Sequence, residues 1–158
     1  MQLSPEITIL LTAMAPIGEL RIALPIALIS FKMNLATAYF LSVAGNIIPV
    51  FFLLLFWKYL AKYLMENFGL FRTFFDWLFE RTRKKFRAKY NRWGKLALVL
   101  FVAIPLPVTG AWTGSLAAWL FGYNYWQSLF LELLGVLIAG VVVSLVSLGG
   151  INFMQFII

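Results

Sequence analysis

Two long apolar stretches of this sequence are interrupted at their centres, the first by two charged residues with prolines and a glycine, and the second by prolines, a threonine and a glycine. The first runs from Ile7 to Phe31 and the second from Leu96 to Phe121. Hydrocarbon offers no hydrogen bonds to unpaired backbone groups, so a broken helix is tolerated there mainly where it is buried in protein or lines a cavity. Ionised side chains in such a segment are also costly. The two breaks therefore indicate places where a membrane protein contacts an ion or a substrate.

The composition agrees with a membrane environment. Hydrophobic residues make up 63% of the chain and charged residues 12%, whereas a soluble domain has about 45–50% and about 25%. A soluble chain of 158 residues could not bury this excess, so we expect lipid to solvate much of it. The chain has no cysteine and no histidine, which excludes disulfides and removes the ligands of most transition-metal sites. We therefore expect no metal site and no cofactor.

Two other apolar stretches, Leu35 to about Leu60 and Tyr125 to Leu148, are long enough to cross a bilayer, which takes about 20 residues. Asn46 and Pro49 break up the first of them. The arms that flank the polar breaks have only about 12 residues, so at about 1.5 Å per residue each reaches part way across. Each broken stretch is therefore predicted to form a re-entrant hairpin, with one kinked span as the alternative for residues 7–31.

The basic residues are concentrated in the middle of the chain. Eleven of the thirteen lie between Lys58 and Lys95. Within residues 65–93, apolar residues rich in phenylalanine recur at spacings of three or four, opposite a charged face, a pattern typical of an amphipathic helix at a membrane interface. Because basic segments between membrane spans stay in the cytoplasm, we expect this linker to be cytoplasmic and to contact anionic lipids rather than nucleic acid.

The two halves of the chain resemble each other. A shift of 90 positions aligns Asn34 with Asn124 and Gly45 with Gly135, along with several apolar pairs. Each half would contain one hairpin and one spanning helix, an odd number of crossings, so the second half would be inverted and both termini would lie outside.

The predicted fold is thus an all-α integral membrane protein with one domain made of two inverted repeats. Each repeat is a re-entrant helical hairpin plus a transmembrane helix. The boundaries are about 3–60 for repeat 1, about 61–94 for the basic amphipathic linker and about 95–150 for repeat 2.

The first break, Ala15 to Arg21, is closed off by Pro25 and contains Glu19. In a functional interpretation, Arg21 holds an anionic group such as a phosphate, while Glu19 exchanges a proton or counterbalances Arg21. The alternative is a buried ion network that fixes the hairpin. We favour function, because ionisable residues within membrane segments usually have one.

The second break contains Pro105, Pro107, Thr109, Gly110 and Trp112. The prolines remove amide donors and stop the incoming helix, and Thr109 is predicted to be the N-cap of the outgoing helix. The free amides at that helix start would form a weak positive pole suited to an anion or a carboxylate. A tight turn without a ligand is the alternative, and Trp112 is either a cavity wall or a packing residue.

Three other features are candidates for function or packing. Asn46 could bond to a hairpin tip or make an ordinary interhelical bond, and Glu132 could be a second proton site or could extend to the interface. Gly110 and Gly114 lie on a small-residue face, which indicates close helix packing or a dimer seam. We expect a homodimer, because two spans and two half-length hairpins enclose little space.

Four segments together carry a family resemblance. They are Pro16-x-x-Glu19-Leu20-Arg21-x-x-x-Pro25, Gly45-Asn46-x-x-Pro49, Pro105-Leu106-Pro107-x-Thr109-Gly110-Ala111-Trp112 and Gly135-Val136-Leu137-Ile138-Ala139-Gly140. On these segments, nearly the whole chain resembles the putative small multidrug export family of bacteria and archaea. Its layout also resembles the wider DedA (VTT-domain) superfamily, in which two re-entrant hairpins face each other.

The resemblance implies a location in the plasma membrane of a bacterium or archaeon. It also implies that Glu19, Arg21, Pro25 and the turn at residues 105–112 are the functional positions. Members of the DedA superfamily are implicated in moving lipids, including polyprenyl phosphate carriers, and in proton-dependent drug and osmotic tolerance.

We therefore expect a small multi-pass transporter or translocase. Its substrate would be amphiphilic, either an anionic lipid such as polyprenyl phosphate or a drug-like molecule. Coupling would be to an ion or proton gradient, because the chain has no nucleotide-binding GxxxxGK[ST] loop. The alternative is a non-transporting scaffold that organises lipids. An enzyme is not expected, because one carboxylate and one arginine make a thin active site.

Overall fold

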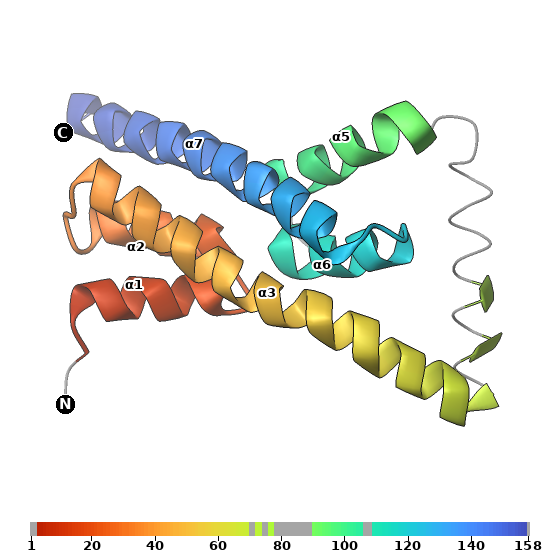
Figure 1. Ribbon diagram of the computed structural model, residues 1–158. Coiled ribbons are helices and arrows are strands. Elements are labelled where there is room, and N and C mark those ends of the chain that lie inside the picture. Colours follow the sequence, from red (N-terminus) through yellow and green to blue (C-terminus); the bar gives the residue numbers. More distant parts are fainter. Residues whose placement is uncertain (1–2, 70–71, 74–75, 78–89, 106–108, 158) are drawn as a thin grey trace.

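The computed structural model describes residues 3–69, 72–73, 76–77, 90–105 and 109–157, and within these ranges all regular structure is helical. The elements are α1 (Pro5–Met14), α2 (Glu19–Ile29), α3 (Leu35–Asn67), α5 (Tyr90–Ala103), α6 (Ala111–Leu120) and α7 (Tyr125–Ile157) (Figure 1). The all-α class predicted from the sequence is therefore confirmed. The predicted amphipathic linker helix lies largely outside the described residues.

The two long helices, α3 and α7, have 33 residues each, which corresponds to about 50 Å at 1.5 Å per residue. By length and composition, Leu35–Asn67 and Tyr125–Gly150 could each cross a membrane. An asparagine starts both helices: the side-chain Oδ1 of Asn34 accepts from the amide of Thr37, and that of Asn124 accepts from the amide of Gln127. Asparagine is among the best residues for capping a helix start in this way.

The predicted interruption of the first span is wrong, because α3 runs without a break through Asn46 and Pro49. Proline removes one helical hydrogen bond, here the bond to the carbonyl of Gly45. A membrane helix tolerates this loss when neighbouring helices support it, and both Pro49 and Asn46 are buried among such neighbours. Helix α3 also extends past the predicted end of repeat 1 at about residue 60, and α5 begins before residue 95.

The four short helices form two antiparallel pairs, α1 with α2 and α5 with α6 (Figure 1). They have 10, 11, 14 and 10 residues, so each is about 15–21 Å long, well short of the roughly 30 Å of a hydrocarbon core. The chain reverses between Met14 and Glu19, where the first break was predicted. Pro25 does not close that break, because α2 continues through it to Ile29.

The two pairs enter the molecule from opposite ends, and their turns lie near its middle (Figure 1). The α1–α2 pair comes from the end that carries both termini, and the α5–α6 pair comes from the end where α3 stops and α5 begins. Helices α3 and α7 run alongside both pairs. The largest core cluster joins α2, α3, α5, α6 and α7 through side chains such as Leu24, Val50, Val102, Ala118 and Val136.

Large apolar side chains cover the outward faces of the long helices. Phe40 and Phe52 on α3, and Leu145 and Val146 on α7, are each at least 66% exposed. A water-soluble protein would bury such residues, whereas a lipid environment solvates them. This surface agrees with a membrane protein.

Two glycines allow short and long helices to approach closely. A Cβ atom at Gly45 would lie 2.5 Å from the carbonyl oxygen of Leu10 and 2.7 Å from Cβ of Ala13, both on α1. A Cβ atom at Gly135 of α7 would lie 2.6 Å from Cβ of Val102 on α5. The 90-residue shift had aligned these two glycines, and each brings a long helix against the first helix of a short pair.

Gly45→Ala should lower the free energy of unfolding by about 1–3 kcal/mol, because the added methyl group would force α1 away from α3. Gly149→Ala is the matched control, since nothing lies within 4 Å of a Cβ atom there, and helix propensity alone should stabilise it by up to about 1 kcal/mol. Reversible unfolding in mixed micelles, followed by circular dichroism, measures both. Equal stability of the two variants would contradict the close approach.

Candidate functional site

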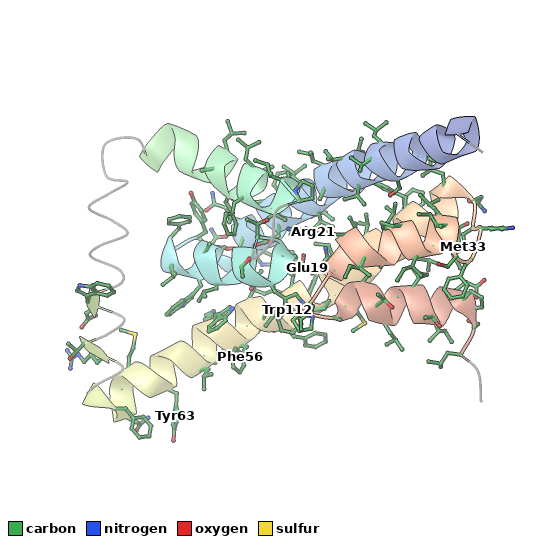
Figure 2. All side chains as sticks on the ribbon, turned by 180° about the vertical axis from the view of Figure 1, so that it is seen from behind. Glu19, Arg21, Met33, Phe56, Tyr63 and Trp112 are labelled. Atoms are coloured by element: carbon green, nitrogen blue, oxygen red, sulfur yellow. The ribbon has the colours of Figure 1, made fainter. Side chains whose placement is uncertain are left out.

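The two predicted breaks meet each other in the structure. Arg21, in the first turn of α2, donates a hydrogen bond from Nη2 to Oγ1 of Thr109 over 2.9 Å. The Thr109 hydroxyl in turn donates to the carbonyl oxygen of Ile104, also over 2.9 Å. Glu19, Arg21 and Trp112 gather at the centre of the molecule, where the helix pairs come together (Figure 2). A charged side chain from one break is thus bonded to a side-chain hydroxyl of the other, and that hydroxyl is bonded to the backbone of its own turn.

Glu19 binds the start of α6. Its Oε2 atom accepts from the amide of Ala111 over 3.2 Å, and its Oε1 atom accepts from the amide of Trp112 over 3.1 Å. The first amides of a helix have no partner within the helix and carry a partial positive charge. Glu19 is only 5% exposed, so these bonds replace the solvation that its carboxylate loses. The positive pole predicted at this helix start is present, and a carboxylate of the same chain occupies it.

The predicted N-cap role of Thr109 is wrong. Helix α6 starts at Ala111, so Gly110 takes the N-cap position and makes no side-chain capping bond. The Thr109 hydroxyl is instead engaged with Ile104 and Arg21. A residue more than ninety positions away in the sequence supplies the cap that a local threonine was expected to supply.

The backbone on both sides of this contact has unusual angles. Glu19 has φ +50°, in the left-handed region that non-glycine residues seldom adopt. Such a residue costs on the order of 1–3 kcal/mol and persists only where surrounding contacts hold it. Gly110 has φ +126°, and a Cβ atom there would collide with the Glu19 carboxylate. The contact therefore requires a glycine at position 110.

Trp112 provides a third connection between the two helix pairs. Its indole Nε1 donates over 3.3 Å to the carbonyl oxygen of Met14, the last residue of α1. Carbonyls at a helix end also lack a partner within the helix. Trp112 therefore acts both as a packing residue and as part of the cavity wall described next.

A cavity of about 560 Å³ opens beside these contacts, within the size range of ligand pockets in proteins. Arg21, Glu19 and Thr109 give it a polar side, while Ile17, Ile22 and Trp112 are apolar. The complete lining is Pro16, Ile17, Gly18, Glu19, Arg21, Ile22, Pro105, Thr109, Trp112 and Thr113. The cavity is therefore amphiphilic and is formed by both breaks together.

Sequence reasoning missed several of these lining residues. Ile17, Ile22 and Thr113 carry no chemistry that would single them out in an apolar sequence. Only their position within or beside the predicted breaks could have indicated that they line the cavity.

Several predicted site residues lie elsewhere. Pro25 is inside α2, and Asn46 is buried in α3; neither lines the cavity. Glu132 of α7 is fully buried, so the alternative in which it extends to the interface is wrong. Pro107 lies outside the described residues.

The small-residue face of α6 is used within the chain. A Cβ atom at Gly114 would lie 2.5 Å from Oε1 of Glu132 and 2.6 Å from Cγ2 of Val102, and Gly110 receives Glu19 in the same way. Of the two predicted uses of this face, close helix packing is present, and the face is therefore occupied where a dimer seam would require it to be open.

Comparisons with known proteins give one match. A family model described as "Putative small multi-drug export protein" matches residues 19–142, which is most of the chain. No curated protein matches the sequence. No solved structure matches it either.

Glu19→Met should destabilise the protein by about 0.5–2 kcal/mol, the usual cost of losing a helix cap. Glu19→Gln should cost less, because its amide oxygen can still accept from one of the two α6 amides. Thermal unfolding measures both, and hydrogen exchange at Ala111 and Trp112 should accelerate in the same order. Lys32→Met is the control, since Lys32 is exposed and has a similar φ of +49°. If Glu19→Met cost no more than Lys32→Met, the cap would be energetically unimportant.

Gly110→Ala should be about 1–3 kcal/mol more destabilising than Gly122→Ala, because only the first places a methyl group on a carboxylate. Both glycines have positive φ, but nothing lies within 4 Å of a Cβ atom at Gly122. Their difference in unfolding free energy therefore isolates the contact with Glu19 from the backbone strain. A difference near zero would show that α6 and Glu19 separate at little cost.

Proposed function

The chain belongs to the putative small multi-drug export protein family, and from this premise we propose that it is a membrane transporter that moves an amphiphilic substrate. The observation that carries the proposal is the cavity at the meeting point of the two breaks. Polar residues inside a membrane protein usually serve a substrate or ion path. Here they converge from two distant segments on one space large enough for a small molecule or a lipid head group.

The charges of the site favour an anionic head group. Both oxygens of Glu19 already accept backbone bonds from α6, so a cationic ligand would have to compete with these amides. Arg21 lines the cavity and donates to a neutral hydroxyl there. A guanidinium is well suited to phosphate, which it can bind through two parallel hydrogen bonds. The apolar wall formed by Ile17, Ile22 and Trp112 suits the first segment of a lipid tail.

A polyprenyl phosphate has this combination of groups and is the substrate class that we propose. Its phosphate would lie at Arg21, and its isoprenoid chain would leave along the exposed apolar surface toward lipid. A drug-like amphiphile with an acidic group would satisfy the same site. Transport would draw on an ion or proton gradient.

The proposed mechanism uses two inverted repeats that move against each other, as in many secondary transporters. Three matched features support this division. Asn34 and Asn124 cap the two long helices, Gly45 and Gly135 receive the first helix of each short pair, and the pairs enter from opposite ends (Figure 1). The pairs would be re-entrant hairpins, with the basic linker cytoplasmic and both termini outside the plasma membrane.

In this mechanism the contacts of Glu19 and Arg21 form a latch between the hairpins. The bonds to Ala111, Trp112 and Thr109 connect α2 to the start of α6. A substrate phosphate would compete with Glu19 for those amides while it pairs with Arg21. Binding would thereby loosen the latch and allow one hairpin to move relative to the other.

Arg21→Ala should lower the rate of polyprenyl phosphate transport about tenfold or more, since a charge-assisted hydrogen bond contributes roughly 1.5–3 kcal/mol. Transport of a fluorescently labelled polyprenyl phosphate across proteoliposomes measures this, and Arg21→Lys should retain part of the rate. Lys95→Ala, which removes an exposed cation on α5, is the control.

Other outcomes would point to other functions. Transport of a cationic dye that is lost in Glu19→Gln but intact in Arg21→Ala would reverse the proposed charge preference. If wild-type protein moved neither probe, the non-transporting scaffold would be the better account of the site.

A further inference from the structure

Glu132 is a buried carboxylate outside the cavity. It is fully buried on α7, and neither of its oxygens has a hydrogen-bond partner among the described residues. It lies against α6 at Gly114. A carboxylate buried without donors costs several kcal/mol unless a cation neutralises it. An interior position of this kind therefore requires either a positive partner or a bound proton.

The residues around Glu132 do not provide that partner. From α5, the groups that face Gly114 and Gly135 are the side chain of Val102 and the backbone carbonyl oxygen of Val99. From α6, Ser115 donates its hydroxyl hydrogen to the carbonyl of Trp112. From α3, the Tyr39 hydroxyl donates to the carbonyl of Leu137.

The charged residues of α2 do not fill this need either. Arg21 is directed to Thr109 at the cavity. Glu19 is negative, and it lies against Gly110 just as Glu132 lies against Gly114. Gly110, the N-cap of α6, and Gly114 are four positions apart, which is about one helical turn. Glu19 and Glu132 therefore approach α6 about one turn from each other. Two like charges at that separation in a low-dielectric interior repel each other strongly.

Asn46 of α3 is a second buried acceptor without a donor. It is 3% exposed, and its Oδ1 atom has no hydrogen-bond partner among the described residues. Tyr39 lies seven residues before Asn46, and therefore on the same helix face, and it reaches the carbonyl of Leu137. Asn46 is thus on the face of α3 that is turned toward α7.

The register of α3 and α7 brings Asn46 within about two residues of Glu132 along the interface. The helices run in opposite directions (Figure 1), with Tyr39 bonded to Leu137 at one point and Tyr125 to Phe51 at another. Glu132 lies between Tyr125 and Leu137, and Asn46 lies between Tyr39 and Phe51. The two unpartnered acceptors therefore occupy the same stretch of the interface.

We propose that Glu132 is an internal proton-binding site. When protonated, its carboxyl group donates a hydrogen bond to the side-chain oxygen of Asn46. A proton taken up from water adds to one carboxylate oxygen, removes the negative charge and creates one O–H donor. The carboxylate oxygens of Glu132 and the Oδ1 atom of Asn46 can only accept, and the proton makes one carboxyl oxygen a donor to the other group. A metal ion fits less well, because hard cations such as Ca²⁺ need about six to eight oxygen ligands, and this pair offers three.

The site also suggests how a proton would be coupled to transport, a role that rests on the proposed function. Glu19 and Glu132 share one face of α6, so any movement of Glu19 away from α6 changes the electrostatic field at Glu132. A substrate that opens the latch would therefore alter proton binding at Glu132, and by linkage proton binding would alter substrate affinity.

Infrared spectroscopy of the full chain in lipid bilayers tests proton binding without requiring transport. The wild type should show the C=O band of a protonated carboxylic acid near neutral pH, and Glu132→Gln should abolish it. Glu6→Gln is the matched control, since Glu6 is an exposed carboxylate on α1, and it should leave the band intact. Asn46→Leu should move the band to higher frequency, because the acid would lose its acceptor.

The proposal is overturned if the wild type lacks the band, if Glu132→Gln keeps it, or if sodium rather than pH controls the spectrum. If Glu132→Gln does not fold, Glu132→Asp serves instead and should shift the band without removing it. The band can be absent while transport still depends on Arg21, and it can be present in a protein that transports nothing. Failure of this proposal is thus distinguishable from failure of the proposed function.

Discussion

The arrangement of this protein depends on one contact, between the carboxylate of Glu19 and the first amides of α6. A helix that begins inside a membrane protein exposes unpaired amides where no water can satisfy them. Glu19 accepts from two of these amides, and they in turn stabilise its buried charge. Each break thus satisfies polar groups of the other. The contact holds the turns of the two helix pairs together, and the cavity lies beside these turns.

The shape of α6 follows from this contact and from the second buried carboxylate. Gly110 and Gly114 leave space where Glu19 and Glu132 approach the helix backbone. The glycines at and near the start of this helix therefore make room for two acidic side chains. The two carboxylates differ in their hydrogen bonds: Glu19 accepts from two backbone amides, whereas Glu132 has no donor among the described residues.

Tertiary packing accounts for the points at which local sequence rules failed. Pro25 was expected to close off the first break and Pro49 to break up the first span, yet α2 and α3 continue through these prolines because neighbouring helices support the backbone. Thr109 had the right type and position for an N-cap, but Arg21 and Ile104 engage its hydroxyl. No sequence window contains both Glu19 and Ala111, so the true cap was not predictable from local spacing. The two breaks that line the cavity were visible in the sequence because charge and proline within an apolar stretch can be recognised one residue at a time.

The sequence by itself indicated the membrane environment of this protein, its two long apolar helices and the location of its polar breaks. These follow from composition, from the length of apolar runs and from the preferences of proline and glycine, all of which act locally. Three features became visible only in the tertiary structure. The two breaks face each other, Glu19 caps α6, and Glu132 lies against Gly114 without a hydrogen-bond partner among the described residues. Such contacts depend on which helix faces meet in space, because a hydrogen bond needs two groups within about 3 Å regardless of their separation along the chain.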